Sequence, residues 1–363
     1  MTTSYRSCRN CGHQIDGAEN CLSCGFGAPT TNYWLQFFLT GFVRLLVSCT
    51  KNAIKVLIGR RPYFDPRVVF FILYVKQLVG RQPIRVTCDN FQSEGVGSQL
   101  LMTINSIAFA RASGLTYLHT PLRKTDHADR PMQEWVAAWE NLFNLGDGKL
   151  MAGEDRNVVN FAWNYLDLAQ CFRVDLDHAL LDIIPELRKK YYKNKLPRTN
   201  QSVVIGIHLR RPAPSENWGK EDQLWTSPEA VLRAASAARS IIEVLDKVCT
   251  IRVFSQGDDV EFTSFREIGA ELHLNADTVW TMQELIESDV MILAKGSCFS
   301  YVAAIICDGI KLYQAGGHIP LGDWVEYDAD GNMDSAQFER QLRGLLAMQS
   351  ESKGFPNQTP MRN

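Results

Sequence analysis

The chain has 363 residues, 45% of them hydrophobic, and a formal net charge of −2 at pH 7. This length suits two medium-sized domains with a small appendage, and so small a charge gives no overall reason to expect a nucleic-acid-binding protein. No apolar stretch precedes the first cysteines, which argues against a secretory signal. Four of the ten cysteines are paired within the first 24 residues, a pattern typical of a reducing compartment with one metal site. We therefore expect a cytoplasmic protein.

Residues 1–27 contain two copies of the motif Cys-x-x-Cys-Gly. The two-residue spacing lets both thiolates of a tight turn face one ion, and the glycine allows the backbone twist of that turn. Four sulfurs complete a tetrahedral shell, so the sequence predicts a structural zinc ribbon rather than two disulfides or a redox site. The ribbon's role stays open between a protein partner, nucleic acid and simple anchoring, with nucleic acid the weakest of these. The predicted zinc ligands are Cys8, Cys11, Cys21 and Cys24.

Residues 28–82 are apolar, aromatic and basic; from residue 31 to residue 87 there are nine Lys or Arg residues and one acid, Asp65. Two apolar runs, 33–46 and 68–75, are short for a membrane span and bounded by charge. The pattern favours helices on the inner surface of a membrane, with aromatic side chains buried and basic ones facing anionic head groups. Helices that pack on the rest of the protein, and a transmembrane or re-entrant hairpin, are the alternatives.

Residues 83–200 begin with a βαβ pattern and continue as a helical, aromatic region. The predicted elements of the βαβ unit are a strand at 84–88, a helix at 99–112 and a strand at 115–119. Three tryptophans fit a hydrophobic core better than a sugar-binding surface: Trp135, Trp139 and Trp163. A charged stretch with a proline, 188–200, predicts the linker into a second domain.

Residues 201–349 alternate between short apolar runs and helical patterns, which predicts a parallel sheet covered by helices on both faces. The predicted strands are 202–209, 250–255, 271–274, 289–294 and 311–314. The predicted helices are 227–247, 259–269, 282–287 and 298–307, with a last helix from Asp334 to about Met348. We expect the tail, 350–363, to be disordered.

Three candidate phosphate-binding segments each follow a predicted strand. In the first, Gly95 and Gly97 would let backbone N–H groups and a helix N-terminus approach a ligand closely. In the second, His208 and Arg210 share a face of their strand at its carboxyl end, where parallel sheets bind ligands. A guanidinium there can hold a diphosphate in bidentate fashion. The simpler interpretations are a glycine turn that only connects two elements and a strand that ends in solvated arginines.

The third segment, 289–300, is a hydrophobic strand that ends in a turn of small residues. Ser297 is placed to cap the following helix, and the hydroxyls of Ser297 and Ser300 would point into the same crevice as Arg210. Helix capping alone explains Ser297, but it does not explain Lys295, Gly296 and Ser300 beside it.

These segments resemble, in order, motifs of the GDP-fucose fucosyltransferases. The matching stretches are His208-Leu-Arg-Arg211, Phe254-Ser-Gln-Gly257 and Ser297-Cys-Phe-Ser300, with Gly95-Val-Gly-Ser-Gln99 similar to the N-terminal Gly-x-Gly-Asn-Gln turn of the family. The resemblance covers roughly residues 84–315 and implies a GT-B architecture: two Rossmann-like α/β domains whose parallel sheets face a cleft. The donor-site residues it implies are Gly95, Gly97, His208, Arg210, Arg211, Ser255, Gly257, Ser297 and Ser300.

The resemblance also implies an inverting transfer without a catalytic metal, in which Arg210, with Arg211 and His208, neutralises the leaving diphosphate. Glu94, directly before the glycine turn, is the best-placed carboxylate to take the proton of an acceptor hydroxyl. Its simpler interpretation is a solvated loop residue, and Asp89 and Asp126 are weaker candidates. Two positions depart from the family pattern, Pro212 and Gln256.

The sequence therefore predicts a glycosyltransferase that moves a sugar, most simply fucose from GDP-fucose, onto a glycan acceptor. The basic segment suggests a lipid-linked acceptor or a membrane surface as a partner. The alternatives are a transferase for another nucleotide sugar or a pyruvyl-type donor, and a degenerate scaffold or nucleic-acid-binding protein that uses the zinc ribbon.

Overall fold

The structure is a computed structural model that describes residues 6–7, 14–15, 85–89, 95–123, 128–151, 158–160, 174–193, 195, 202–211 and 226–353. The short strands β1 (Arg6–Ser7) and β2 (Gln14–Ile15) pair antiparallel. The predictions for the four zinc ligands, the segment 28–82, Glu94, Asp126, Trp163 and residues 354–363 lie outside the described residues and stay predictions.

The larger sheet has six parallel strands in the order β12-β11-β10-β7-β8-β9. Their bounds are β7 (Val203–His208), β8 (Cys249–Ser255), β9 (Glu271–Leu274), β10 (Val290–Ile292), β11 (Ile310–Gln314) and β12 (Val325–Tyr327). Numbered along the chain, this is the doubly wound order 3-2-1-4-5-6, which reverses direction between β7 and β10. The apolar run of β7 is buried from Val203 to Ile207, as its place at the centre of the sheet requires.

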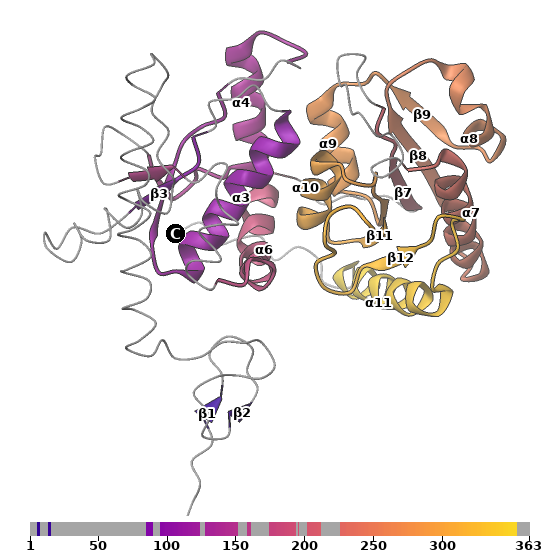
Figure 1. The fold of residues 1–363 in the computed structure, drawn as a ribbon. Coiled ribbons are helices and arrows are strands. Elements are labelled where there is room, and N and C mark those ends of the chain that lie inside the picture. The colour runs from indigo at the N-terminus through magenta and orange to yellow at the C-terminus, as the bar shows by residue number, and fades with distance from the viewer. Residues whose placement is uncertain are drawn as a thin grey trace, which may run out of the picture.

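Helices cover both faces of this sheet (Figure 1). On one face lie α7 (Pro228–Val244), α8 (Thr263–Glu267) and α11 (Ser335–Lys353), and on the other α9 (Thr278–Ile286) and α10 (Cys298–Ile306). A short 3₁₀ helix, Asp259–Phe262, precedes α8. The predicted start of α7 is confirmed, because the Ser227 side chain accepts a hydrogen bond from the backbone of Ala230 and Pro228 occupies the first turn.

The smaller sheet has four parallel strands in the order β5-β4-β3-β6. Their bounds are β3 (Arg85–Thr87), β4 (Thr116–His119), β5 (Leu150–Met151) and β6 (Val158–Asn160), and the helices of this part are α3 (Val96–Ala112), α4 (Met132–Phe143) and α6 (Leu176–Tyr192). The chain order again reverses beside the first strand, between β3 and β6. Trp135 and Trp139 on α4 are buried, as expected of core residues.

One apolar core joins the two parts of the chain. The helices α3, α4 and α6 share a continuous cluster of buried side chains with α9 and α10, and α3 and α10 face each other between the sheets in Figure 1. Arg188 on α6 adds a polar link, because its Nε and Nη2 donate to the carbonyls of Ile306 and Cys307 at 3.0 and 2.6 Å. These bonds satisfy carbonyls at the end of α10 that no helical N–H can reach.

The predicted fold class, α/β with two parallel sheets, is confirmed, and four details differ from the prediction. First, α9 begins at Thr278 rather than near 282, because the Asp277 side chain accepts a hydrogen bond from the Trp280 backbone at 2.8 Å. Second, α6 extends into the predicted linker as far as Tyr192. Third, the sequence did not predict β5, β6 or the edge strand β12, each only two or three residues long. Fourth, α11 continues to Lys353, so the first residues of the predicted disordered tail, 350–353, are helical.

Candidate functional site

A cavity of about 410 Å³ lies where the two parts of the chain meet. The part of the chain that contains the smaller sheet contributes residues 95–98, at the start of α3, and Trp135 of α4. The part that contains the larger sheet contributes the carboxyl ends of β7 and β8, the start of α9 and the turn before α10. The cavity therefore lies at the point where the strand order of the larger sheet reverses, which is where open α/β sheets bind ligands.

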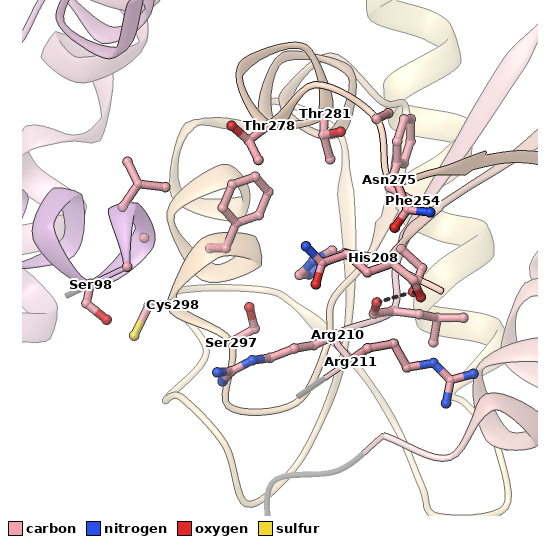
Figure 2. A pocket seen from close by; sticks show the side chains of 18 of the residues that line it. Ser98, His208, Arg210, Arg211, Phe254, Asn275, Thr278, Thr281, Ser297 and Cys298 are labelled. Atoms are coloured by element: carbon pink, nitrogen blue, oxygen red, sulfur yellow. Dashed lines mark hydrogen bonds between the residues drawn. The ribbon is translucent and has the colours of Figure 1, made fainter. Parts of the chain in front are cut away.

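Arg210 and Ser297 line this one cavity, although 86 residues separate them in the sequence. Arg210 follows β7, and Ser297 follows β10, the strand next to β7 in the sheet. Figure 2 shows both residues at the same side of the cavity, with Ser98 and Cys298 close by. The structure thus brings the predicted guanidinium and the predicted helix start to one place.

Arg211 also lines the cavity, but its guanidinium points the opposite way from that of Arg210 (Figure 2). Its Nη2 pairs with Glu261 Oε2 at 3.3 Å, and its guanidinium carbon lies 5.2 Å from the centre of the Phe262 ring. These partners belong to the 3₁₀ helix outside the cavity. Of the two adjacent arginines, Arg210 is therefore the one that extends toward Ser297 (Figure 2).

His208 lines the cavity as a neutral side chain. Burial, with a smaller effect from the neighbouring Arg210 charge, lowers the pKa of His208 to about 4. Its ring centre lies 5.3 Å from that of Phe299, and its Nδ1 is buried with no hydrogen-bond partner among the described residues. Without a ligand the imidazole is therefore neutral at pH 7 and can exchange a hydrogen bond with a bound group. Its expected part in balancing a diphosphate stays a prediction.

Two helix N-termini meet at the cavity. Gly95 lies at the start of α3 and Ser297 at the start of α10, and both residues line the cavity wall. The first N–H groups of a helix have no partner within the helix and carry a partial positive charge, so each start favours a bound anion. Gly97 also lines the cavity, and it has a further reason to be glycine, since a Cβ there would collide with the backbone of Cys298 and Phe299.

The turn before α10 is built by its small residues. Gly296 has a φ of +66°, a left-handed conformation that glycine adopts without strain. Ser297 caps α10 by accepting from the Ser300 backbone at 3.5 Å. Ser300 itself is fully buried, with its hydroxyl 3.4 Å from the carbonyls of Ala294 and Ser297. The structure therefore keeps Ser300 out of the cavity wall, and its hydroxyl holds the turn.

Ser255 and Gly257 follow β8, and the structure separates them. Ser255 lines the cavity, and its hydroxyl donates to the Leu209 carbonyl at 2.7 Å, which ties the ends of β7 and β8 together. Gly257 is not part of the wall. Its N–H donates to Asn275 Oδ1 at 3.2 Å and its carbonyl accepts from Asn275 Nδ2 at 3.0 Å, so Asn275 fixes this turn at the edge of the cavity.

Sequence reasoning missed the wall provided by α9. Thr278 and Thr281 on its first turn line the cavity. The Asp129 carboxylate accepts from the Thr278 backbone and hydroxyl at 3.3 and 2.7 Å, and Arg130 forms an ion pair with Asp277. These contacts join the two parts of the chain at the edge of the cavity. Asp277, at the position of a helix cap, could have indicated from the sequence that α9 begins here. Nothing in the sequence indicates that the start of α9 contacts Asp129.

None of the candidate general bases is among the described residues that line the cavity. Asp89 pairs with Arg123 at 2.8 Å; burial raises its pKa, and the Arg123 charge opposes this shift. Glu94 lies outside the described residues, directly before Gly95 of the wall. The described part of the chain holds no group of three or more His, Cys, Asp or Glu side chains suited to a metal ion, and none of its helices has the length and apolar character of a membrane span.

No protein-family model and no curated protein matches the sequence. Among solved structures, the chain is similar to POFUT1 in complex with GDP, at 12% identity and a TM-score of 0.33 over 66% of this chain and 96% of that one. It is also similar to a UDP-forming α,α-trehalose-phosphate synthase from Burkholderia vietnamiensis, at 13% identity and 0.28 over 85% and 79% of the two chains. For a UDP-GlcNAc 2-epimerase from Neisseria meningitidis the values are 10% and 0.25, over 83% and 81%. Such scores say nothing of substrate, so the function rests on the cavity itself.

Proposed function

We propose that this protein is a glycosyltransferase that binds a nucleoside diphosphate sugar in the cavity, with the diphosphate between Arg210 and the N-terminus of α10. The observation that carries the proposal is that Arg210 and Ser297 line one cavity at the reversal point of a doubly wound sheet. A guanidinium grips two phosphate oxygens in one plane. A helix N-terminus adds unpaired N–H donors and the positive end of the helix dipole.

The proposed reaction makes the diphosphate the leaving group. The acceptor hydroxyl oxygen attacks the anomeric carbon from the face opposite the diphosphate, the bond from this carbon to the phosphate oxygen breaks, and the diphosphate leaves with the bonding electrons. Arg210 and the start of α10 stabilise the negative charge that develops on it. Because these groups are fixed by β7, β10 and the turn before α10, they need little rearrangement as the charge develops.

Glu94 is the proposed general base, and it takes the proton of the acceptor hydroxyl. This role is supported by its position in the sequence directly before Gly95, which lines the same cavity on the side of the smaller sheet. An acceptor bound on that side would meet the donor between the two helix starts. The inversion of configuration follows from the attack opposite the leaving group.

At the finer level we propose fucose from GDP-fucose as the donor and a glycan as the acceptor, in a transfer that needs no catalytic metal. The support is the order and content of the motifs around Arg210, Ser255 and Ser297. A structural zinc ion at the N-terminal cysteines, a cytoplasmic location at the inner face of a membrane and a lipid-linked acceptor complete the proposal. Their support is the sequence pattern of residues 1–82.

Isothermal titration calorimetry with GDP, UDP and CMP tests the proposal on the wild-type chain, Arg210→Ala and Arg343→Ala. Arg343 is an exposed arginine of α11 that pairs with Glu339, so its variant removes the same charge outside the site. We expect GDP to bind best, Arg210→Ala to lose most of the affinity and Arg343→Ala to keep it.

Each other pattern of binding points to a different function. A preference for UDP that Arg210→Ala removes would keep the transferase and reject the fucose donor. Affinity for none of the nucleotides, together with salt-dependent binding of DNA or RNA, would reject the transferase in favour of a scaffold or nucleic-acid-binding protein.

A further inference from the structure

Behind the turn that carries Ser297 lies a glycine-rich loop, residues 315–322, which follows β11 and has no role in the proposed reaction. Gly317 packs on the turn so closely that a Cβ there would lie 2.6 Å from the Gly296 nitrogen. The φ angle of Gly317 lies outside the left-handed region. The close approach of the two backbones is therefore the reason for a glycine at 317.

The same loop is bound to the first turns of α10. The Tyr301 hydroxyl donates to the Ile319 carbonyl at 2.8 Å, and the Tyr301 ring stacks on the His318 ring with centres 4.5 Å apart. Tyr301 is one turn after Ser297, so the loop contacts both the turn before α10 and the helix itself. The position of the helix start depends on this loop as well as on the sheet.

Beside this contact, a small cavity of about 10 Å³ lies between His318 of the loop and the turn, and Gly296 and Ser297 form part of its wall. It has room for about one water molecule. His318 Nε2 and Gln314 Oε1, from two other residues of its wall, are buried and have no hydrogen-bond partner among the described residues. Two polar atoms without partners at a space of this size fit a water molecule that bridges the loop and the turn.

We propose that Gly317 and His318 are positioning residues for the diphosphate, and that they hold the Gly296–Ser297 turn where the N-terminus of α10 faces the main cavity. Gly317 fixes the position of the turn through direct backbone contact. His318 fixes the position of the turn through its stacking on Tyr301 and through its polar edge in the small cavity. Neither residue lines the main cavity, so each acts only through the turn. This inference rests on the proposed placement of the diphosphate.

The experiment measures the affinity for inorganic pyrophosphate by calorimetry and the thermal midpoint of unfolding in the full chain. Gly317→Ala is compared with Gly344→Ala, the same change on α11 at a place where a Cβ meets no atom within 4 Å. His318→Ala is compared with His318→Gln, which restores a polar edge. We expect Gly317→Ala and His318→Ala to weaken binding by about tenfold or more, since displacements near 1 Å have large effects on such sites. Gly344→Ala should bind as the wild type, and His318→Gln should recover most of the loss.

A folded Gly317→Ala with wild-type affinity would overturn the inference, as would His318→Gln binding no better than His318→Ala. Should Gly317→Ala fail to fold, the two His318 variants decide the question, because rescue by Gln with an unchanged thermal midpoint separates positioning from general stability. Wild-type protein that binds pyrophosphate through this loop but transfers no sugar would end the proposed function and leave the inference standing. Wild-type protein that does not bind pyrophosphate would overturn both.

Discussion

Gly97 of α3 touches the backbone of Phe299 on α10, and a Cβ on Gly97 would lie 2.4 Å from the Phe299 nitrogen. This contact joins the first turns of two helices that belong to different sheets. Both helix starts lie at the main cavity, so the contact sets the distance between them. The absence of a side chain at one position therefore determines the width of the proposed active site.

Gly97→Ala should push the two helix starts apart. Real Cβ atoms do not approach backbone atoms this closely, so the change costs about 1–3 kcal/mol of unfolding free energy, as overpacking does elsewhere. Gly95→Ala is the matched control, because a Cβ at Gly95 meets nothing within 4 Å. Urea unfolding curves of the two variants measure the difference, and equal stability would show that α3 can shift at little cost.

Much of the larger sheet could be predicted from the sequence because its strands are short, apolar and separated by clear helical patterns. The presence of Arg210 and Ser297 at one cavity follows from that pattern, since each comes shortly after one of two parallel strands. The neutral state of His208 could not be predicted, because it depends on burial by Phe299, 91 residues further along the chain. The contact of Gly97 with α10 was equally hidden, since one sequence does not show which helices touch.

Arg210→Lys should weaken the binding of a nucleoside diphosphate by about tenfold or more. Lysine keeps the charge but replaces the planar fork of five donors with a single ammonium group, so the bidentate grip on two oxygens is lost. Calorimetry gives the dissociation constants, with Arg343→Lys as the control on the surface of α11. If Arg210→Lys bound as tightly as the wild type, charge alone would suffice and the bidentate geometry would be rejected.

His208 should make the folded chain less stable as the pH falls from about 6.5 to about 4. Burial lowers the pKa of His208 to about 4, while in the unfolded chain it titrates near 6.5. The unfolded state binds more protons in this window, so the unfolding free energy falls with pH, by up to about 3 kcal/mol for this group. Unfolding curves between pH 4 and 7 should show a shallower slope for His208→Gln, whereas His178→Gln on the surface of α6 should follow the wild type. An unchanged slope in His208→Gln would mean that folding does not shift the pKa of this imidazole.

Asp129 should act in the same direction as His208 but in a lower pH window. Burial acts to raise its pKa, but hydrogen bonds from Arg130 and Thr278 outweigh this and lower the pKa to about 2. Its contribution to stability is therefore complete above about pH 4 and is lost as the pH falls toward 2. The stability difference between the wild type and Asp129→Asn should shrink over this window, measured against Asp182→Asn on α6. A difference that stays constant from pH 4 to pH 2 would show that the contact with α9 does not depend on the charge.

Glu94→Gln should abolish most of the turnover and leave donor binding intact. The amide keeps the size of the side chain but cannot take a proton, and the loss of a general base typically lowers the rate by about 10²- to 10⁴-fold. In the proposed site Arg210 and the start of α10, and not Glu94, hold the diphosphate, so the dissociation constant of the donor should change little. Turnover of the donor with a glycan acceptor, measured beside calorimetry of the diphosphate, separates the two effects. Near-normal turnover would remove Glu94 from the mechanism, and a parallel loss of donor affinity would place it on the donor side instead.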